Sequence, residues 1–121
     1  MAKSKQSLNV LFVCSMARLR SKTAAHCIGA GSDYAGTDKD ADKPVTVDDI
    51  KKADLIVCME SRHRSKIRRK VKGVSKKIIV WDIQDIYEYM DDTLVAIIKS
   101  KYETQVYNRM DKWLNLNQLE G

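Results

Sequence analysis

Short apolar runs alternate along this chain with segments in which hydrophobic residues recur at helical spacing. Three of these runs lie at residues 8–13, 54–59 and 77–81, and a shorter one lies at residues 33–36. Short runs that are apolar at nearly every position are typical of parallel strands covered on both faces, because such strands expose no face to water. The pattern therefore predicts four strands.

The segments between these runs carry helix signals. We expect helices over residues 23–28 and 61–72, each followed by glycine. Thr46, with Asp49 three residues later, resembles a capping box and predicts the start of another helix. A last helical pattern starts at Asp91 and continues to the C-terminal region, as one helix or as two separated by a kink.

Strands that alternate with helices predict an α/β fold. We expect a single domain over residues 8–121, with a four-stranded parallel sheet in the order 2-1-3-4 and helices on both faces. The whole chain has 121 residues, which is enough for one modest core. Residues 1–7 are mostly polar, so we expect a flexible N-terminal tail without the apolar region of a signal peptide.

Composition narrows the class of protein. No apolar run approaches the length of about 18 residues that a membrane-spanning helix needs, so we expect no membrane partner. The chain has three cysteines, Cys14, Cys27 and Cys58. Their odd number and the absence of metal-ligand spacing favour a reducing, cytoplasmic location and no metal. The net charge of +6 favours acidic or phosphorylated partners without identifying one.

The strongest chemical signal follows the first apolar run. This run leads into Cys14, and after five further residues come Arg20 and Ser21, where a helix can begin. A loop between a strand end and a helix start makes an anion site, because its amides point inward and the helix N-terminus adds positive potential. The residues of this predicted phosphate-binding loop are Ser15, Met16, Ala17, Arg18, Leu19, Arg20 and Ser21.

A cysteine beneath a bound phosphate can act as a nucleophile. Thiols near helix N-termini and cations ionise more readily than free thiols, so the pattern predicts a Cys14 thiolate that attacks phosphorus in line. Arg20 would hold the equatorial oxygens through two parallel hydrogen bonds, and Ser21 would donate its hydroxyl to the sulfur. A lone cysteine is more often an inert core residue, but the spacing to Arg20 and Ser21 favours catalysis.

This stretch resembles the active-site loop of the low-molecular-weight protein tyrosine phosphatases, whose signature is an apolar strand followed by Cys-x5-Arg-Ser. Residues 34–37, 53–60 and 82–87 resemble further segments of that family in the same order, and the likeness to short bacterial members covers residues 8 to about 100. The resemblance implies a phosphatase for phosphotyrosine proteins or small aryl phosphates. It also implies a cysteinyl-phosphate intermediate, no cofactor, and a loop that binds phosphate, sulfate or vanadate.

The resemblance also implies a general acid. In the family's Asp-Ile-Pro-Asp-Pro-Tyr segment the second Asp has this role, and that position is Asp85 here, whereas Asp82 matches the first Asp. Asp85 would protonate the leaving oxygen and then activate water. Tyr87 and Tyr89 follow, at positions that wall the substrate pocket in the family, and an aromatic wall suits an aryl phosphate.

The loop departs from the family pattern at two positions that matter for its backbone. Ala17 stands where members usually carry a bracing asparagine, and Met16 stands where many carry glycine. Anion loops need left-handed backbone angles, which Gly and Asn tolerate better than Ala or Met. This departure predicts low activity or, as an alternative, a catalytically weak relative that binds phosphorylated partners.

Two further alternatives rest on other residues. Residues 62–77 are rich in lysine and arginine, as a solvated helix face or a nucleic-acid-binding surface would be, but they contain no aromatic residue for base stacking. Arsenate reductases of the same fold have a similar loop and relay a disulfide through further cysteines, a role that Cys27 or Cys58 would have to fill. We favour the phosphatase and do not expect a nucleic-acid partner.

Overall fold

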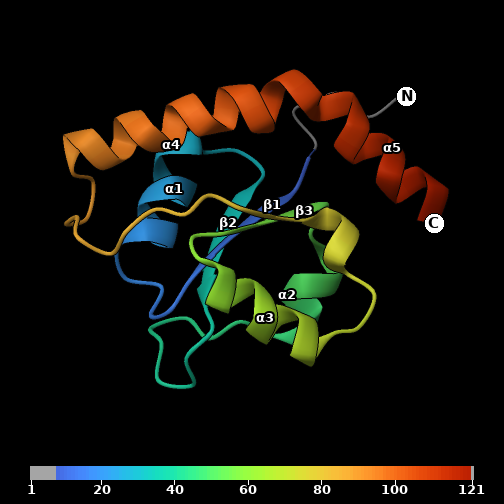
Figure 1. Cartoon of the computed structure of the whole chain (residues 1–121), viewed down its shortest axis with the longest axis horizontal. Coiled ribbons are helices and arrows are strands. Elements are labelled where there is room, and N and C mark those ends of the chain that lie inside the picture. Colours follow the sequence, from blue (N-terminus) through green and yellow to red (C-terminus); the bar gives the residue numbers. More distant parts are fainter. Residues whose placement is uncertain (1–7, 121) are drawn as a thin grey trace.

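Figure 1 shows a computed structural model of the protein, which describes residues 8–120 and, for residues 116–120, the backbone alone. The predicted tail, residues 1–7, lies outside the described residues, as does Gly121. The strands are β1 (Val10–Cys14), β2 (Ser32–Gly36), β3 (Leu55–Cys58) and β4 (Ile78–Val80). They form one parallel sheet in the order β2-β1-β3-β4, which confirms the predicted class and strand order.

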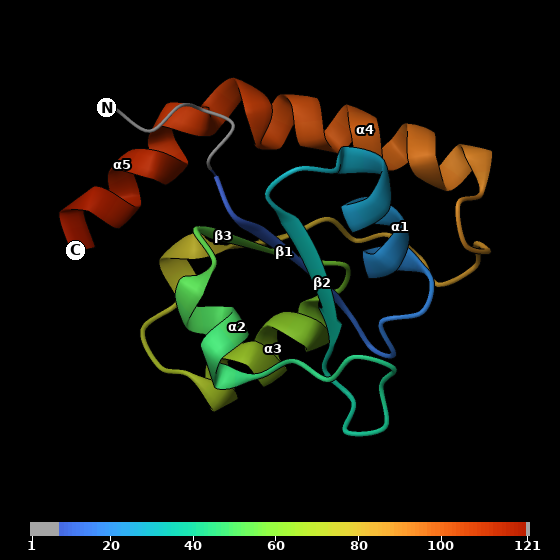
Figure 2. The same cartoon turned by 180° about the vertical axis from the view of Figure 1, so that it is seen from behind.

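Helices cover both faces of the sheet. Their bounds are α1 (Arg20–Ile28), α2 (Val47–Lys52), α3 (Ser61–Lys70), α4 (Asp92–Gln105) and α5 (Met110–Glu120). Figures 1 and 2 show α1, α4 and α5 on one face and α2 and α3 on the other. No helix within residues 8–120 is long and apolar enough to cross a membrane.

Two hydrophobic cores lie on the two faces of the sheet. Phe12 and Cys14 of the central strand β1 belong to the core beneath α1 and α4, whereas Leu11 and Val13 belong to the core beneath α2 and α3. This alternation follows from the period of two along a strand, so a shift of one residue would turn Cys14 to the opposite face. Burial of β1 on both faces thus determines the side on which the thiol lies.

Several predicted boundaries move by a few residues. Helix α1 begins at Arg20 rather than at residue 23, so the anion loop runs directly into the helix. Helix α3 ends at Lys70, because Val71 is already extended with φ of −138°. The C-terminal pattern forms two helices separated by the 3-10 turn Tyr107–Arg109, and the indole of Trp113 donates a 3.1 Å hydrogen bond to the Gln105 carbonyl across this break.

Two loops and one helix start lie together at the carboxyl ends of the strands. Figures 1 and 2 show the loop after β1, the loop after β2 and the start of α3 at the same end of the sheet. In both views the loop after β1 lies between residues 37–44 and the segment that follows β4. Ligand sites of open parallel sheets form at this end, because the loops that leave neighbouring strands diverge there.

Candidate active site

The backbone of the loop after β1 is oriented to receive an anion. The carbonyl oxygens of Cys14, Ser15 and Met16 accept hydrogen bonds of 2.9 to 3.0 Å from backbone amides within residues 37–42. A trans peptide unit points its carbonyl and the following N–H in opposite directions. The amides of residues 15–17 therefore point away from that neighbouring segment, toward the interior of the loop.

Ala17 supplies the left-handed turn of this loop. Its φ is 61° and its side chain is buried, so the structure confirms that the loop needs a left-handed residue, while Met16 does not take this conformation. Such a conformation costs an alanine roughly 1 kcal/mol. Gly36 of β2 packs against the same loop, because a Cβ at this position would lie only 2.5 Å from the Ser15 carbonyl oxygen.

The thiol of Cys14 lies at the base of this loop. Its Sγ atom is 3.0 Å from the hydroxyl oxygen of Ser21, which is fully buried in the first turn of α1. Leu19, the N-cap residue of α1, offers no side-chain acceptor to the first helical amides. These amides and the helix dipole are therefore available to an anion bound above the sulfur.

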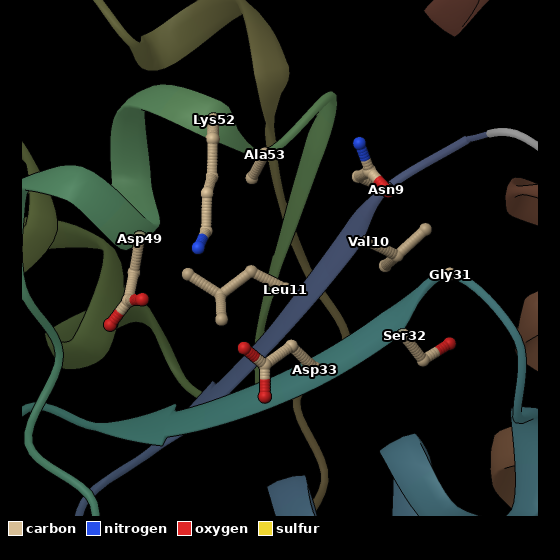
Figure 3. A pocket seen from close by; sticks show the side chains of 9 residues that line it. All are labelled: Asn9, Val10, Leu11, Gly31, Ser32, Asp33, Asp49, Lys52 and Ala53. Atoms are coloured by element: carbon tan, nitrogen blue, oxygen red, sulfur yellow. The ribbon is translucent and has the colours of Figure 1, made fainter.

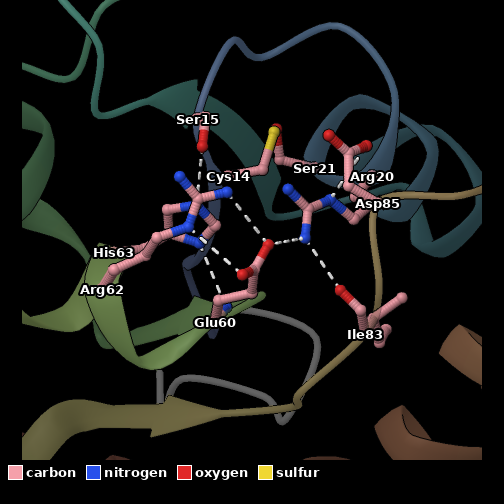
Figure 4. Close-up of polar contacts among 9 residues, drawn as sticks. All are labelled: Cys14, Ser15, Arg20, Ser21, Glu60, Arg62, His63, Ile83 and Asp85. Carbon is pink, nitrogen blue, oxygen red and sulfur yellow. Dashed lines mark hydrogen bonds and ion pairs between the residues drawn. The ribbon is translucent and has the colours of Figure 1, made fainter.

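The Arg20 guanidinium is buried and held from behind. Its Nη1 donates to the Ile83 carbonyl at 2.8 Å and to the carboxylate of Glu60, and its Nε lies 3.6 Å from Asp85 (Figure 4). Only 2% of the Arg20 side chain is exposed. These contacts orient the planar guanidinium, which is the group best suited to bind two oxygens of a phosphate at once.

Glu60 is a site residue that our sequence reasoning missed. Hydrogen bonds from Arg62 and from Arg20 lower the pKa of its carboxyl to about 2, against a smaller opposing effect of burial. Glu60 therefore stays ionised and holds Arg20 in place. The available signal was its position two residues after β3, at the strand end where sites of this fold class form.

His63, in the first turn of α3, is buried and hydrogen-bonded at both ring nitrogens. Its Nδ1 accepts the Glu60 backbone N–H at 3.0 Å, so in the neutral ring Nε2 carries the hydrogen and donates to the Ser15 hydroxyl at 2.9 Å. Burial, followed by the neighbouring charges of Arg20 and Arg62, lowers the pKa of His63 to about 4. The imidazole is therefore neutral near pH 7 and fixes the orientation of the Ser15 hydroxyl.

These groups surround a small pocket with a volume of about 200 Å³. Its lining residues are Cys14, Ser15, Met16, Arg18, Leu19, Arg20 and Asp85. Asp85, at 56% exposure, lies at the rim beside Arg20, whereas Asp82 is exposed outside the lining with φ of 55°. The structure thus brings together the predicted nucleophile, the predicted arginine and the carboxylate that we preferred as the acid.

Comparison with known proteins identifies the fold. No protein-family model matches the sequence, and no curated protein matches it either. SP-PTP, a low-molecular-weight protein tyrosine phosphatase from Streptococcus pyogenes, aligns with a TM-score of 0.65 and 14% identity over 82% of this chain and 93% of its own. The YwlE arginine phosphatase from Geobacillus stearothermophilus aligns with a TM-score of 0.62 and 19% identity over 93% and 96%.

The tyrosine phosphatase Wzb from Escherichia coli K30, whose structure is a complex with phosphate, aligns with a TM-score of 0.60 and 17% identity over 79% of this chain and 94% of its own. This chain has the fold of the low-molecular-weight protein tyrosine phosphatases. Identities this low establish the fold, and the side chains of this chain itself determine its chemistry.

The two tyrosines predicted to wall the pocket lie elsewhere in this structure. Tyr87 is half-buried against the core beneath α1. A 2.6 Å hydrogen bond joins the Tyr89 hydroxyl to Nδ1 of His26. The centre of the Tyr89 ring lies 5.1 Å from the Lys22 ammonium. Neither tyrosine belongs to the lining of the Cys14 pocket. Their role as a substrate wall stays a prediction.

The other two cysteines are separated from the site. Cys58 belongs to the core beneath α2 and α3, across the sheet from Cys14, and burial raises its pKa to about 12. Cys27 is half-buried on α1, and burial raises its pKa as well. Neither thiol lines the Cys14 pocket, so the structure offers no support for a disulfide relay.

A larger pocket of about 430 Å³ lies at the opposite ends of the strands, beside Asn9 of the chain entering β1 (Figure 3). Asp33, Asp49 and Lys52 are its charged lining residues, and Asp33 pairs with Lys43. The lining contains no cysteine, histidine or arginine. It therefore lacks the nucleophile and the planar cation that the Cys14 pocket combines.

Proposed function

We propose that the protein hydrolyses aryl phosphate monoesters, above all phosphotyrosine in proteins, through a cysteinyl-phosphate intermediate. The observation that carries this proposal is that one site combines the Cys14 thiol with the buried Arg20 guanidinium. Cys14 Sγ is hydrogen-bonded to the Ser21 hydroxyl, and the Nη1 of Arg20 already donates to Glu60 and Ile83. Within residues 8–120 the Nη2 group of Arg20 has no hydrogen-bond partner, so it is free to bind a phosphoryl oxygen.

In the first step the Cys14 thiolate attacks phosphorus. The S–P bond forms as the P–O bond to the aryl group breaks, and the carboxyl of Asp85 gives its proton to the leaving oxygen. Arg20 and the inward-facing amides of residues 15–17 hold the equatorial oxygens as their charge shifts. The Ser21 hydroxyl stabilises the sulfur anion through its hydrogen bond.

In the second step water releases the phosphate. The Asp85 carboxylate takes a proton from a water molecule whose oxygen attacks phosphorus. The S–P bond breaks, inorganic phosphate leaves, and Cys14 returns to the thiolate. The two steps are balanced and require no oxidant, reductant or metal ion from outside.

The proposal is tested by hydrolysis of para-nitrophenyl phosphate with reduced protein, in the presence of a chelator, from mildly acidic to neutral pH. Cys14→Ser should abolish turnover, and Asp85→Asn should lower kcat by roughly 10²- to 10⁴-fold. Asp82→Asn is the matched control, because this neighbouring carboxylate lies outside the pocket, and its activity should stay near that of the parent. Turnover that survives Cys14→Ser would overturn the mechanism.

The same assay separates the alternative functions. Absence of turnover together with retained vanadate binding would identify a binding-only relative, the alternative that Ala17 supports through its strained φ of 61°. Phosphoarginine is included as a substrate, because the fold neighbours comprise tyrosine and arginine phosphatases. Arsenate-dependent oxidation of thiols that is lost in Cys27→Ser or Cys58→Ala would favour arsenate reduction.

A further inference from the structure

A basic hollow of about 450 Å³ lies beside the phosphate-binding loop. Its lining residues are Thr37, Asp38, Lys39, Val45, Lys66, Arg69 and Lys70. The four cations come from two segments, the loop after β2 and the C-terminal half of α3, and none of the four forms a salt bridge within residues 8–120. The folded chain therefore collects unpaired positive charge from distant parts of the sequence around one concave surface.

Two backbone hydrogen bonds connect the lining of this hollow to the lining of the Cys14 pocket, although no residue lines both. The backbone N–H of Thr37 donates to the Cys14 carbonyl at 2.9 Å, and the N–H of Asp38 donates to the Ser15 carbonyl at 3.0 Å. Two of the residues that line the hollow, Thr37 and Asp38, are thus hydrogen-bonded to the loop that lines the pocket. Figures 1 and 2 show the loop 37–44 and the start of α3 at the same end of the sheet as the phosphate-binding loop, and α3 runs from there along the face of the sheet.

The polar groups of the lining favour an anionic ligand. The hydroxyl oxygen of Thr37 is buried and has no hydrogen-bond partner among the described residues. Asp38 is the acidic residue of the lining, and its carboxylate is engaged by the Asp40 N–H at 2.9 Å. Four cations against one carboxylate leave the hollow strongly positive, which attracts negatively charged groups.

We propose that this hollow is a second anion subsite, which binds acidic side chains of a phosphotyrosine peptide whose phosphoryl group occupies the Cys14 pocket. This inference rests on the proposed function. A peptide suits the position, because an extended chain advances by about 3.3–3.6 Å per residue and can reach from one site to the neighbouring one. The lining contains no aromatic side chain on which a nucleic-acid base can stack, so a peptide is favoured over RNA.

The test compares kcat/KM for phosphotyrosine peptides that carry Asp residues before or after the phosphotyrosine with kcat/KM for Asn-substituted versions of the same peptides. The parent protein should prefer the best acidic peptide by about ten-fold at low salt and less at high salt, because exposed ion pairs are screened. The triple variant Lys66→Gln, Arg69→Gln, Lys70→Gln should reduce this preference to below about three-fold. Its turnover of para-nitrophenyl phosphate should stay unchanged.

A matched control comes from the neighbouring segment. Arg68→Gln, Lys72→Gln and Lys76→Gln remove the same charge from exposed residues that do not line the hollow, and this variant should keep the preference of the parent. Equal kcat/KM for acidic and neutral peptides in the parent, or equal loss of preference in both triple variants, would overturn the subsite. RNA binding that only the first triple variant loses, without any peptide preference, would assign the hollow to nucleic acid instead.

Binding measurements keep the subsite testable if the proposed function fails. When para-nitrophenyl phosphate is not hydrolysed, the affinity of the parent for the same fluorescent peptides decides the matter. Tighter binding of the acidic peptide that the first triple variant weakens, and the control variant does not, supports the subsite without catalysis. Equal binding of both peptides by all three proteins contradicts it.

Discussion

At the level of single residues, Gly36 shows how closely β2 approaches the phosphate-binding loop. A Cβ there would lie 2.5 Å from the Ser15 carbonyl oxygen and 2.6 Å from the Cβ of Ala41. We expect Gly36→Ala to lower the free energy of unfolding by about 1–3 kcal/mol and to weaken vanadate binding, because the loop has to move. Urea unfolding and calorimetric titration with vanadate measure the two effects.

A double variant that combines Gly36→Ala with Ala41→Gly tests which of these two contacts causes the loss. It removes one of the close contacts but leaves the backbone oxygen of Ser15 in place. We therefore expect it to restore little of the lost stability or vanadate affinity. Full recovery in the double variant would show that the clash involves the Ala41 side chain rather than the loop.

The lowered pKa of His63 leads us to expect that the free energy of unfolding depends on pH. Its pKa is about 4 in the folded protein and close to 6.5 in the unfolded chain, so protons bind the unfolded chain first as the pH falls. The contribution of His63 is therefore complete above about pH 6.5 and is lost between about pH 6.5 and 4, by up to about 3 kcal/mol.

His63→Gln tests this dependence, because glutamine keeps a donor for Ser15 but does not titrate. Urea unfolding at a series of pH values should show a smaller decline between about pH 6.5 and 4 in the variant than in the parent. Parallel curves for the two proteins would contradict the assignment. Glu60, with its pKa near 2, contributes a separate loss that begins below about pH 4.5.

At the level of elements, the short helix α2 depends on its N-terminal cap. The hydroxyl of Thr46 accepts the Asp49 N–H at 3.0 Å, and the Asp49 carboxylate accepts the Thr46 N–H at 3.0 Å, as the sequence predicted. Thr46→Ala should lower the free energy of unfolding by about 1 kcal/mol. Asp48→Ala removes an exposed ion pair with Lys52 and one favourable charge near the helix N-terminus, and it should cost only about 0.5 kcal/mol.

This cap matters beyond α2 itself. The helix carries the fully buried Ile50 into the core beneath α2 and α3. That core covers the face of β1 opposite Cys14 and holds α3, whose N-cap residue Glu60 and first-turn residue His63 lie at the site. Chemical denaturation of both variants decides the prediction, and equal destabilisation by Thr46→Ala and Asp48→Ala would contradict it.

At the level of the whole molecule, oxyanions should stabilise the fold. A ligand that binds only the folded state adds RT ln(1 + [L]/Kd), or about 2.7 kcal/mol at a hundred times its Kd. We expect vanadate or phosphate to raise Tm in the parent. In Arg20→Lys the increase should be much smaller, because lysine cannot make two parallel hydrogen bonds to one oxyanion.

Thermal unfolding with increasing vanadate measures this linkage, and sodium chloride at matched ionic strength controls for general screening. An equal rise of Tm in the parent and in Arg20→Lys would place the stabilising anion elsewhere on this basic molecule. The hollow beside the loop is the first place to look in that case, because its four cations are unpaired within residues 8–120.

The sequence by itself determined where the strands begin and end to within a few residues, the class of fold and the loop that contains Cys14 and Arg20. These features are local, because a buried strand, a turn and a helix start each depend on the types of consecutive residues. The same holds for the Thr46 cap. The spacing of Asp85 from the loop was interpretable only through the family resemblance, because no local pattern relates two strand ends that are distant in the chain.

Only the tertiary structure decided how the arginine is held and where the tyrosines lie. Glu60 and His63 reach the loop because β3 lies beside β1 in the sheet, a neighbour relation between segments some forty residues apart. Tyr89 contacts His26 and not the pocket, because the segment after β4 crosses α1. Contacts of this kind depend on packing between distant elements, which hydrophobic periodicity does not specify.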